Sequence, residues 1–173
     1  MTDSSKKDFW INMSIREIQT QAHFAKIAYE NIKPKSLKYS DNTFSSIHSF
    51  LTHCALISKL LAAKYKDENK HFIGKTLGVS DNSIIHNRGF RNDLDHYDER
   101  LMSWVDKTGP KANVVDYNVM PINSINVPNL TYIRNYDPST NIYTFMNEPF
   151  DIGSLYGEAE KIESMADNWL KNN

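Results

Sequence analysis

Apolar residues recur every three or four positions in four stretches of this chain, which is the spacing of an amphipathic helix. The stretches predict helices over residues 6–31, 41–66, 83–107 and 151–172. Proline at position 34 ends the first helix because it disfavours a helical residue before it. The pattern therefore predicts a mainly α protein.

The core-facing positions of the first two helices follow from the same spacing. In the first helix they are Phe9, Trp10, Met13, Ile18, Ala22, Ala25 and Tyr29. In the second they are Phe44, Ile47, Leu51, Cys54, Ile57, Ser58 and Leu61. These two rows predict that the helices pack against each other and against at least one further element.

The pattern changes after residue 110. Residues 130–136 and 142–145 alternate like strands, and the turn-forming residues 137–141 lie between them, so we expect a β-hairpin. A two-stranded ribbon this short is not stable alone and must pack on the helices. We therefore expect its aromatic residues to pack rather than stack on bases; they are Tyr132, Tyr136, Tyr143 and Phe145.

These elements predict one domain over residues 1–173. We expect a helical core over 6–110 and an extension over 111–173 formed by the β-hairpin and the C-terminal helix. Residues 67–80 read as a loop with at most one short turn. The expected fold is a helical bundle with a small β-hairpin and a C-terminal helix.

Charge is unevenly distributed along the chain. The net charge is -1, but residues 1–70 carry a balance of +4 and residues 71–173 a balance of -5. No global basic field indicates nucleic acid or an anionic membrane. An RNA-binding surface is therefore expected to take its cations from the first two helices.

The single cysteine, Cys54, excludes an internal disulfide framework and a cysteine-based zinc site. It lies in an apolar run, where a small buried side chain is expected rather than a nucleophile. No apolar stretch approaches the roughly 20 residues that span a bilayer, and the first residues are polar. We expect a cytoplasmic protein without a membrane partner.

The segment Arg91-Asn92-Asp93-Leu94-Asp95-His96 carries the chemistry. On a helix, Arg91 and His96 are separated by about 7.5 Å along the axis and by roughly 140° around it. Arginine is a permanent planar cation that holds phosphate, and histidine moves protons near neutral pH. The pair indicates phosphodiester chemistry without a metal or a cofactor.

Arg91, Asn92 and His96 resemble the signature of the HEPN superfamily, an arginine, a polar residue and a histidine four to six positions later. The resemblance implies a HEPN-like helical core over 6–110, a homodimer with facing motif helices, and in many members metal-independent RNA cleavage in toxin–antitoxin or antiphage systems. Arg91 would hold the scissile phosphate and His96 would transfer a proton. Asn92 would orient the imidazole or bind a phosphate oxygen. An antitoxin or another regulatory protein would be a partner.

Arg88 lies one turn before Asn92, so it is a candidate second phosphate contact. The acidic neighbours Asp93, Asp95 and Asp98 would repel RNA unless they point outward or pair with the arginines.

Other interpretations remain open. The arginine and histidine can be structural residues of a helical scaffold, or part of a non-catalytic HEPN-like module that dimerises and binds a protein or a nucleotide. A metal site is a weaker alternative, because His-Glu-x-x-His and paired Glu-x-x-His motifs are absent from the sequence. His48 and His53 are expected to be partly buried or interfacial rather than ligands.

Overall fold

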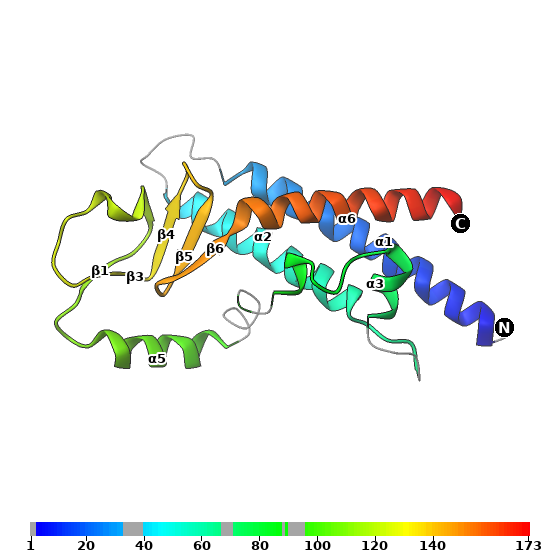
Figure 1. Cartoon of the computed structure of the whole chain (residues 1–173), viewed down its shortest axis with the longest axis horizontal. Coiled ribbons are helices and arrows are strands. Elements are labelled where there is room, and N and C mark those ends of the chain that lie inside the picture. Colours follow the sequence, from blue (N-terminus) through cyan, green and yellow to red (C-terminus); the bar gives the residue numbers. More distant parts are fainter. Residues whose placement is uncertain (1–2, 33–39, 67–70, 88, 90–95) are drawn as a thin grey trace.

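The computed structural model describes residues 3–32, 40–66, 71–87, 89 and 96–173. Three long helices form the body: α1 (Asp3–Glu30), α2 (Ser40–Leu61) and α6 (Ile152–Asn172). They run along the long axis, and α1 packs against both α2 and α6 (Figure 1). The sheet lies at one end of this body, with both chain termini toward the other end (Figure 1). The protein is mainly α, as expected.

The inner row predicted for α2 is correct at all seven positions, because every one of these residues is buried. In α1, Ile18, Ala22 and Ala25 are buried, as predicted. Phe9 and Met13, however, are 60% and 48% exposed, so the prediction that they belong to the core is wrong.

Trp10 explains this difference. Its ring faces Tyr65 and Phe72, with centroid separations of 5.2 and 6.2 Å, and so fixes which side of the first turns of α1 is inward. Phe9 and Met13 lie roughly 150–170° around the axis from the buried row of Ile15, Ile18 and Ala22. The spacing of apolar residues indicates a helix, but it does not determine which of two apolar rows packs against other elements.

The predicted continuous helix over 83–107 is also wrong. Ser83 caps a short 3-10 helix, η1 (Ile84–His86), which ends at Asn87 with an extended backbone. The Asn87 side chain accepts a hydrogen bond from the amide of Gly89, which is itself helical, at 2.9 Å. His96 has φ −125° and ψ 43°, and α5 (Tyr97–Thr108) begins after it. His96 therefore lies at the N-cap of α5 and not in the interior of a helix.

The loop expected over 67–80 contains α3 (Phe72–Leu77), whose Ile73 and Leu77 are buried. This helix packs against α1, α2 and α6. It is short enough to carry little periodicity of its own, which is why the sequence pattern missed it.

The predicted hairpin is confirmed. Strands β4 (Arg134–Asp137) and β5 (Ile142–Phe145) are antiparallel, with Asp137 opposite Ile142. The strand predicted over 130–136 is divided at Ile133 into β3 (Leu130–Tyr132) and β4. Strand β3 is not part of the hairpin and pairs in parallel with β1 (Asn113–Val115). The four expected aromatic side chains are buried, which supports packing as their role.

Two further strands extend the hairpin into a mixed sheet with the order β2-β4-β5-β6. Strand β2 (Asn118–Val119) is parallel to β4, and β6 (Glu148–Asp151) is antiparallel to β5. Met146 and Asn147 both have positive φ, 48° and 67°, and form the two-residue turn between β5 and β6. The remaining short element is a 3-10 helix, η2 (Ile122–Ser124).

The predicted last helix is confirmed as α6, with Asp151 as its N-cap. Its buried residues join the same core cluster as those of α1, α2 and the sheet. One hydrophobic core therefore contains residues from both 6–110 and 111–173. No helix in the described parts of the chain is long and apolar enough to cross a membrane.

Candidate functional site

Of the predicted site residues, His96 is the one that the structure places. Its side chain is 59% exposed at the N-cap position of α5, and its Nδ1 lies 3.8 Å from the Glu99 carboxylate. Arg88, Arg91 and Asn92 lie outside the described residues, as do Asp93 and Asp95.

Tyr97 anchors the start of α5 to the sheet. Its hydroxyl accepts a hydrogen bond from the Arg134 guanidinium at 3.0 Å, and its ring lies 5.6 Å from that of Phe145. Arg134 also forms a 2.6 Å ion pair with Asp116 and lies over the ring of Tyr117. His96 is thus attached to a segment that several interactions hold against the sheet.

One side of α5 is basic. With 3.6 residues per turn, His96, Arg100 and Lys107 fall within roughly 40° of one another around the axis. Asp98 is exposed and lies on the other side of the helix, away from this basic side. Of the acidic residues expected to point away from a phosphate site, Asp98 is thus exposed and directed away from the basic side of α5.

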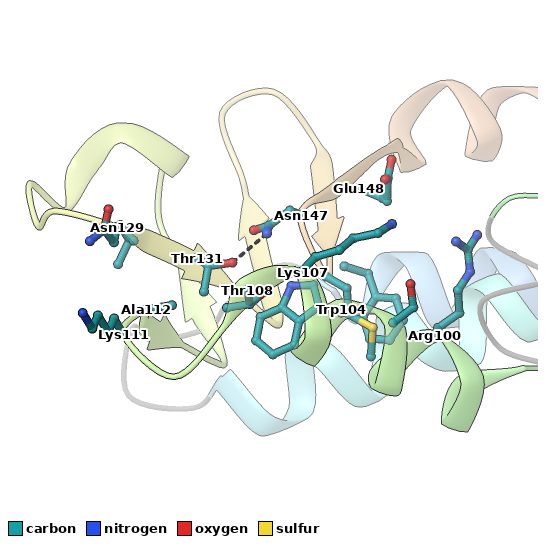
Figure 2. Close-up of a pocket in the computed structure, with 14 residues that line it drawn as sticks. Arg100, Trp104, Lys107, Thr108, Lys111, Ala112, Asn129, Thr131, Asn147 and Glu148 are labelled. Atoms are coloured by element: carbon teal, nitrogen blue, oxygen red, sulfur yellow. Dashed lines mark hydrogen bonds between the residues drawn. The ribbon is translucent and has the colours of Figure 1, made fainter.

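The basic side of α5 borders a cavity of about 450 Å³ between this helix and the strands (Figure 2). Its charged lining consists of Arg100, Lys107 and Lys111 on one hand and Glu148 on the other. The three cations all come from residues 71–173, the part of the chain with the negative charge balance. An RNA-binding surface was expected to take its cations from the first two helices instead. Figure 2 shows the side chains of Arg100 and Lys107 rising from α5 on the side of the sheet.

Two polar side chains on the sheet side are held in place. Asn147 donates from Nδ2 to Thr131 Oγ1 at 2.6 Å and accepts from the Tyr132 amide at 3.0 Å. Because Thr131 accepts this bond, its own hydroxyl hydrogen can be directed to another acceptor. Both residues line the cavity.

Trp104 lies between the cations along α5 and also lines the cavity. It is 9% exposed, and its indole Nε1 is buried. Among the residues that the structure describes, none accepts a hydrogen bond from this N–H. A buried donor without an acceptor is unfavourable.

Other nucleophilic and metal-binding groups have structural roles. Cys54 is fully buried, and burial raises the pKa of its thiol, so it is not an activated nucleophile. His53 is partly buried, as predicted; it donates from Nδ1 to Gln21 Oε1 at 2.7 Å, and burial lowers its pKa. Within the described ranges, no three His, Cys, Asp or Glu side chains converge as metal ligands do.

A comparison with protein-family models gives no match, and comparisons with curated proteins and with solved structures give none either.

The residues of the cavity were not identified from the sequence. Lys107, Lys111, Thr131 and Asn147 form no short motif, and they come from a helix, a loop, a strand and a turn. One signal was present: Arg100, Trp104 and Lys107 recur at helical spacing after His96.

Proposed function

We propose that this protein is a HEPN-like, metal-independent endoribonuclease of a bacterial toxin or antiphage defence system. The observation that supports the proposal best is the position of His96, an exposed imidazole at the start of α5 with Arg100 and Lys107 on the same side of the helix. These cations give RNA phosphates an electrostatic path toward the imidazole.

In the proposed reaction, Arg91 holds the scissile phosphate and Asn92 and Arg88 support it. The ribose 2′-oxygen attacks phosphorus as its proton passes to a base, and the bond to the 5′-oxygen breaks as that oxygen gains a proton. His96 performs one of these two proton transfers, for which an imidazole is suited near neutral pH. The products are a 2′,3′-cyclic phosphate and a 5′-hydroxyl.

A homodimer would bring two such sets of side chains together. A row of exposed apolar residues on α1 supports this part of the proposal: Phe9, Met13, Phe24 and Ile27. The exposed Arg16 and Thr20 lie between Met13 and Phe24, so the row consists of two small apolar patches of the kind that protein interfaces contain. We expect light scattering to give twice the monomer mass and Phe24→Asp to lower it. A wild-type monomer at all concentrations would contradict the dimer.

Cleavage of RNA by the purified protein in EDTA tests the catalytic proposal. We expect wild-type protein to leave cyclic phosphate ends, and Arg91→Ala and His96→Ala to lose activity by at least about a hundredfold, the usual contribution of a positioned acid or base. His23→Ala is a matched control, because its imidazole is also exposed but lies on α1. Equal cleavage by all four proteins would show that Arg91 and His96 are not the catalytic residues.

A non-catalytic HEPN-like module that dimerises and binds a partner protein or a nucleotide is the second candidate. It is favoured by the cavity lining, which contains three cations but not His96. RNA binding that depends on Lys107 and Lys111, without cleavage by wild-type protein, would support this module over the enzyme. An antitoxin or other regulatory partner fits either proposal.

A further inference from the structure

We propose that the cavity between α5 and the sheet is a binding site for a nucleoside monophosphate, a phosphate monoester joined to a planar ring. This inference does not depend on RNA cleavage, because none of the residues that carry it belongs to the Arg91/His96 motif. It assigns a ligand class to a pocket whose volume, about 450 Å³, lies in the range of small-molecule sites.

Hydrogen-bond donors dominate the polar lining. Lys107 and Lys111 supply ammonium groups and Arg100 a guanidinium. The Thr131 hydroxyl, which already accepts from Asn147, is a further donor. A lining of this kind selects an anionic ligand rich in acceptors, and phosphate has these properties.

The other part of the lining is apolar and comes mainly from the sheet side. Leu130, Phe145 and Met146 line the cavity together with the Trp104 indole. Phe145 and Met146 are buried, so their positions are fixed by the core. Inorganic phosphate leaves this apolar surface uncovered, whereas a nucleobase covers it.

Glu148 is the one carboxylate in the lining. The Lys107 side chain extends toward it (Figure 2). A carboxylate accepts a hydrogen bond from a sugar hydroxyl or an exocyclic amine, both of which a nucleotide carries and inorganic phosphate lacks. Glu148 would also repel additional negative charge, which favours a monophosphate over a triphosphate.

The site is partly formed before a ligand binds. The Asn147 side chain is held by the Tyr132 amide and by Thr131, and its φ of 67° places it in the turn between β5 and β6. A group already held in position loses little further conformational entropy when it binds a ligand.

Titration of the full-length protein with each of the four ribonucleoside 5′-monophosphates tests the proposal, with calorimetry for affinity and NMR for the indole N–H signals. The protein has three tryptophans, and the Trp104 signal is assigned as the one missing in Trp104→Phe. We expect saturable binding of at least one nucleotide, a change in the Trp104 N–H signal because this indole lines the cavity, and affinity at least about tenfold weaker for the nucleoside and for inorganic phosphate.

The variants locate the site. Lys107→Ala and Lys111→Ala should each weaken binding about tenfold, and Asn147→Gly should weaken it while keeping the left-handed backbone. Lys75→Ala and Lys171→Ala, which remove lysines from α3 and α6, should change affinity less than twofold. His96→Ala should bind normally, so loss of RNA cleavage and loss of this site are distinguishable.

Three results would overturn the proposal: no saturable binding of any monophosphate at millimolar concentration, binding that is unchanged in Lys107→Ala and Lys111→Ala, or equal affinity for nucleotide and nucleoside. Equal affinity for nucleotide and inorganic phosphate would overturn the assignment of a nucleotide.

Discussion

Asp151 ends the last strand and caps the last helix. Its carboxylate accepts hydrogen bonds from the Ser154 amide at 2.8 Å and the Ser154 hydroxyl at 2.6 Å, and these bonds lower the pKa of the carboxyl group. One residue therefore fixes where α6 begins.

Asp151→Ala should lower the free energy of unfolding by about 1 kcal/mol at pH 7, because it removes the cap. The depressed pKa means that the ionised form is favoured by folding, so this contribution is lost as pH falls through the folded-state pKa. Urea unfolding followed by circular dichroism measures the difference. Asp151→Asn is the control and should retain most of the stability, and an equal loss in both variants would contradict capping.

His86 makes the stability of the protein depend on pH near neutrality. Its ring lies 5.1 Å from that of His71, and burial, followed by the charge of His71, lowers its pKa from 6.5, although Asp81 and Glu158 act in the opposite direction. The unfolded chain therefore binds a proton at a higher pH than the folded protein does.

We expect the free energy of unfolding to fall as pH is lowered from 7.5 through 6.5, and His86→Asn to reduce this slope. His53, whose pKa is also lowered by burial, leaves a remaining slope in the variant. Denaturation at pH 7.5, 6.5 and 5.5 measures the effect. An unchanged slope in His86→Asn would show that His86 is not responsible.

At the scale of elements, small residues set how closely the long helices pack. Ala22 and Ala25 of α1 and Ala159 and Ala166 of α6 are all buried. Helix axes approach each other more closely where the contacting side chains are small.

Ala25→Leu should cost about 1–3 kcal/mol of unfolding free energy, because Ala25 is fully buried and a larger side chain would have to displace its neighbours. Asn168→Leu, at an exposed position of α6, is the control and should change stability by less than about 0.5 kcal/mol. Equal stability of Ala25→Leu and wild type in chemical denaturation would mean that the packing adjusts easily.

At the scale of the whole molecule, α6 completes the core that α1 and α2 begin. Ile152, Leu155 and Ile162 of this helix are buried in the same cluster as Ile18 and Phe50. A protein that ends before α6 would expose this apolar surface.

We therefore expect a chain of residues 1–110 to lack cooperative unfolding, while the full chain unfolds in one transition. Circular dichroism during thermal and urea denaturation distinguishes the two. A sharp transition for residues 1–110 with native helix content would show that the helical part folds without the hairpin and α6.

The sequence alone determined the elements with strong local patterns. The row of α2, the β4–β5 hairpin and the extent of α6 were predictable because each repeats one period over many residues and ends at a cap, a turn or a loop. For the site, His96 was predicted together with Arg88, Arg91 and Asn92; the structure places His96 at the start of α5, and the roles of all four residues stay predictions.

Only the tertiary structure decided the features that depend on distant segments. Periodicity places Phe9 and Met13 in an apolar row, but the contacts of Trp10 determine that this row is exposed. The cavity brings Lys107 together with Thr131 and Asn147, which no sequence spacing relates. A local sequence pattern predicts a single helix or strand, because it depends on neighbouring residues only. Which other element covers each face of that helix or strand depends on how all the elements pack together.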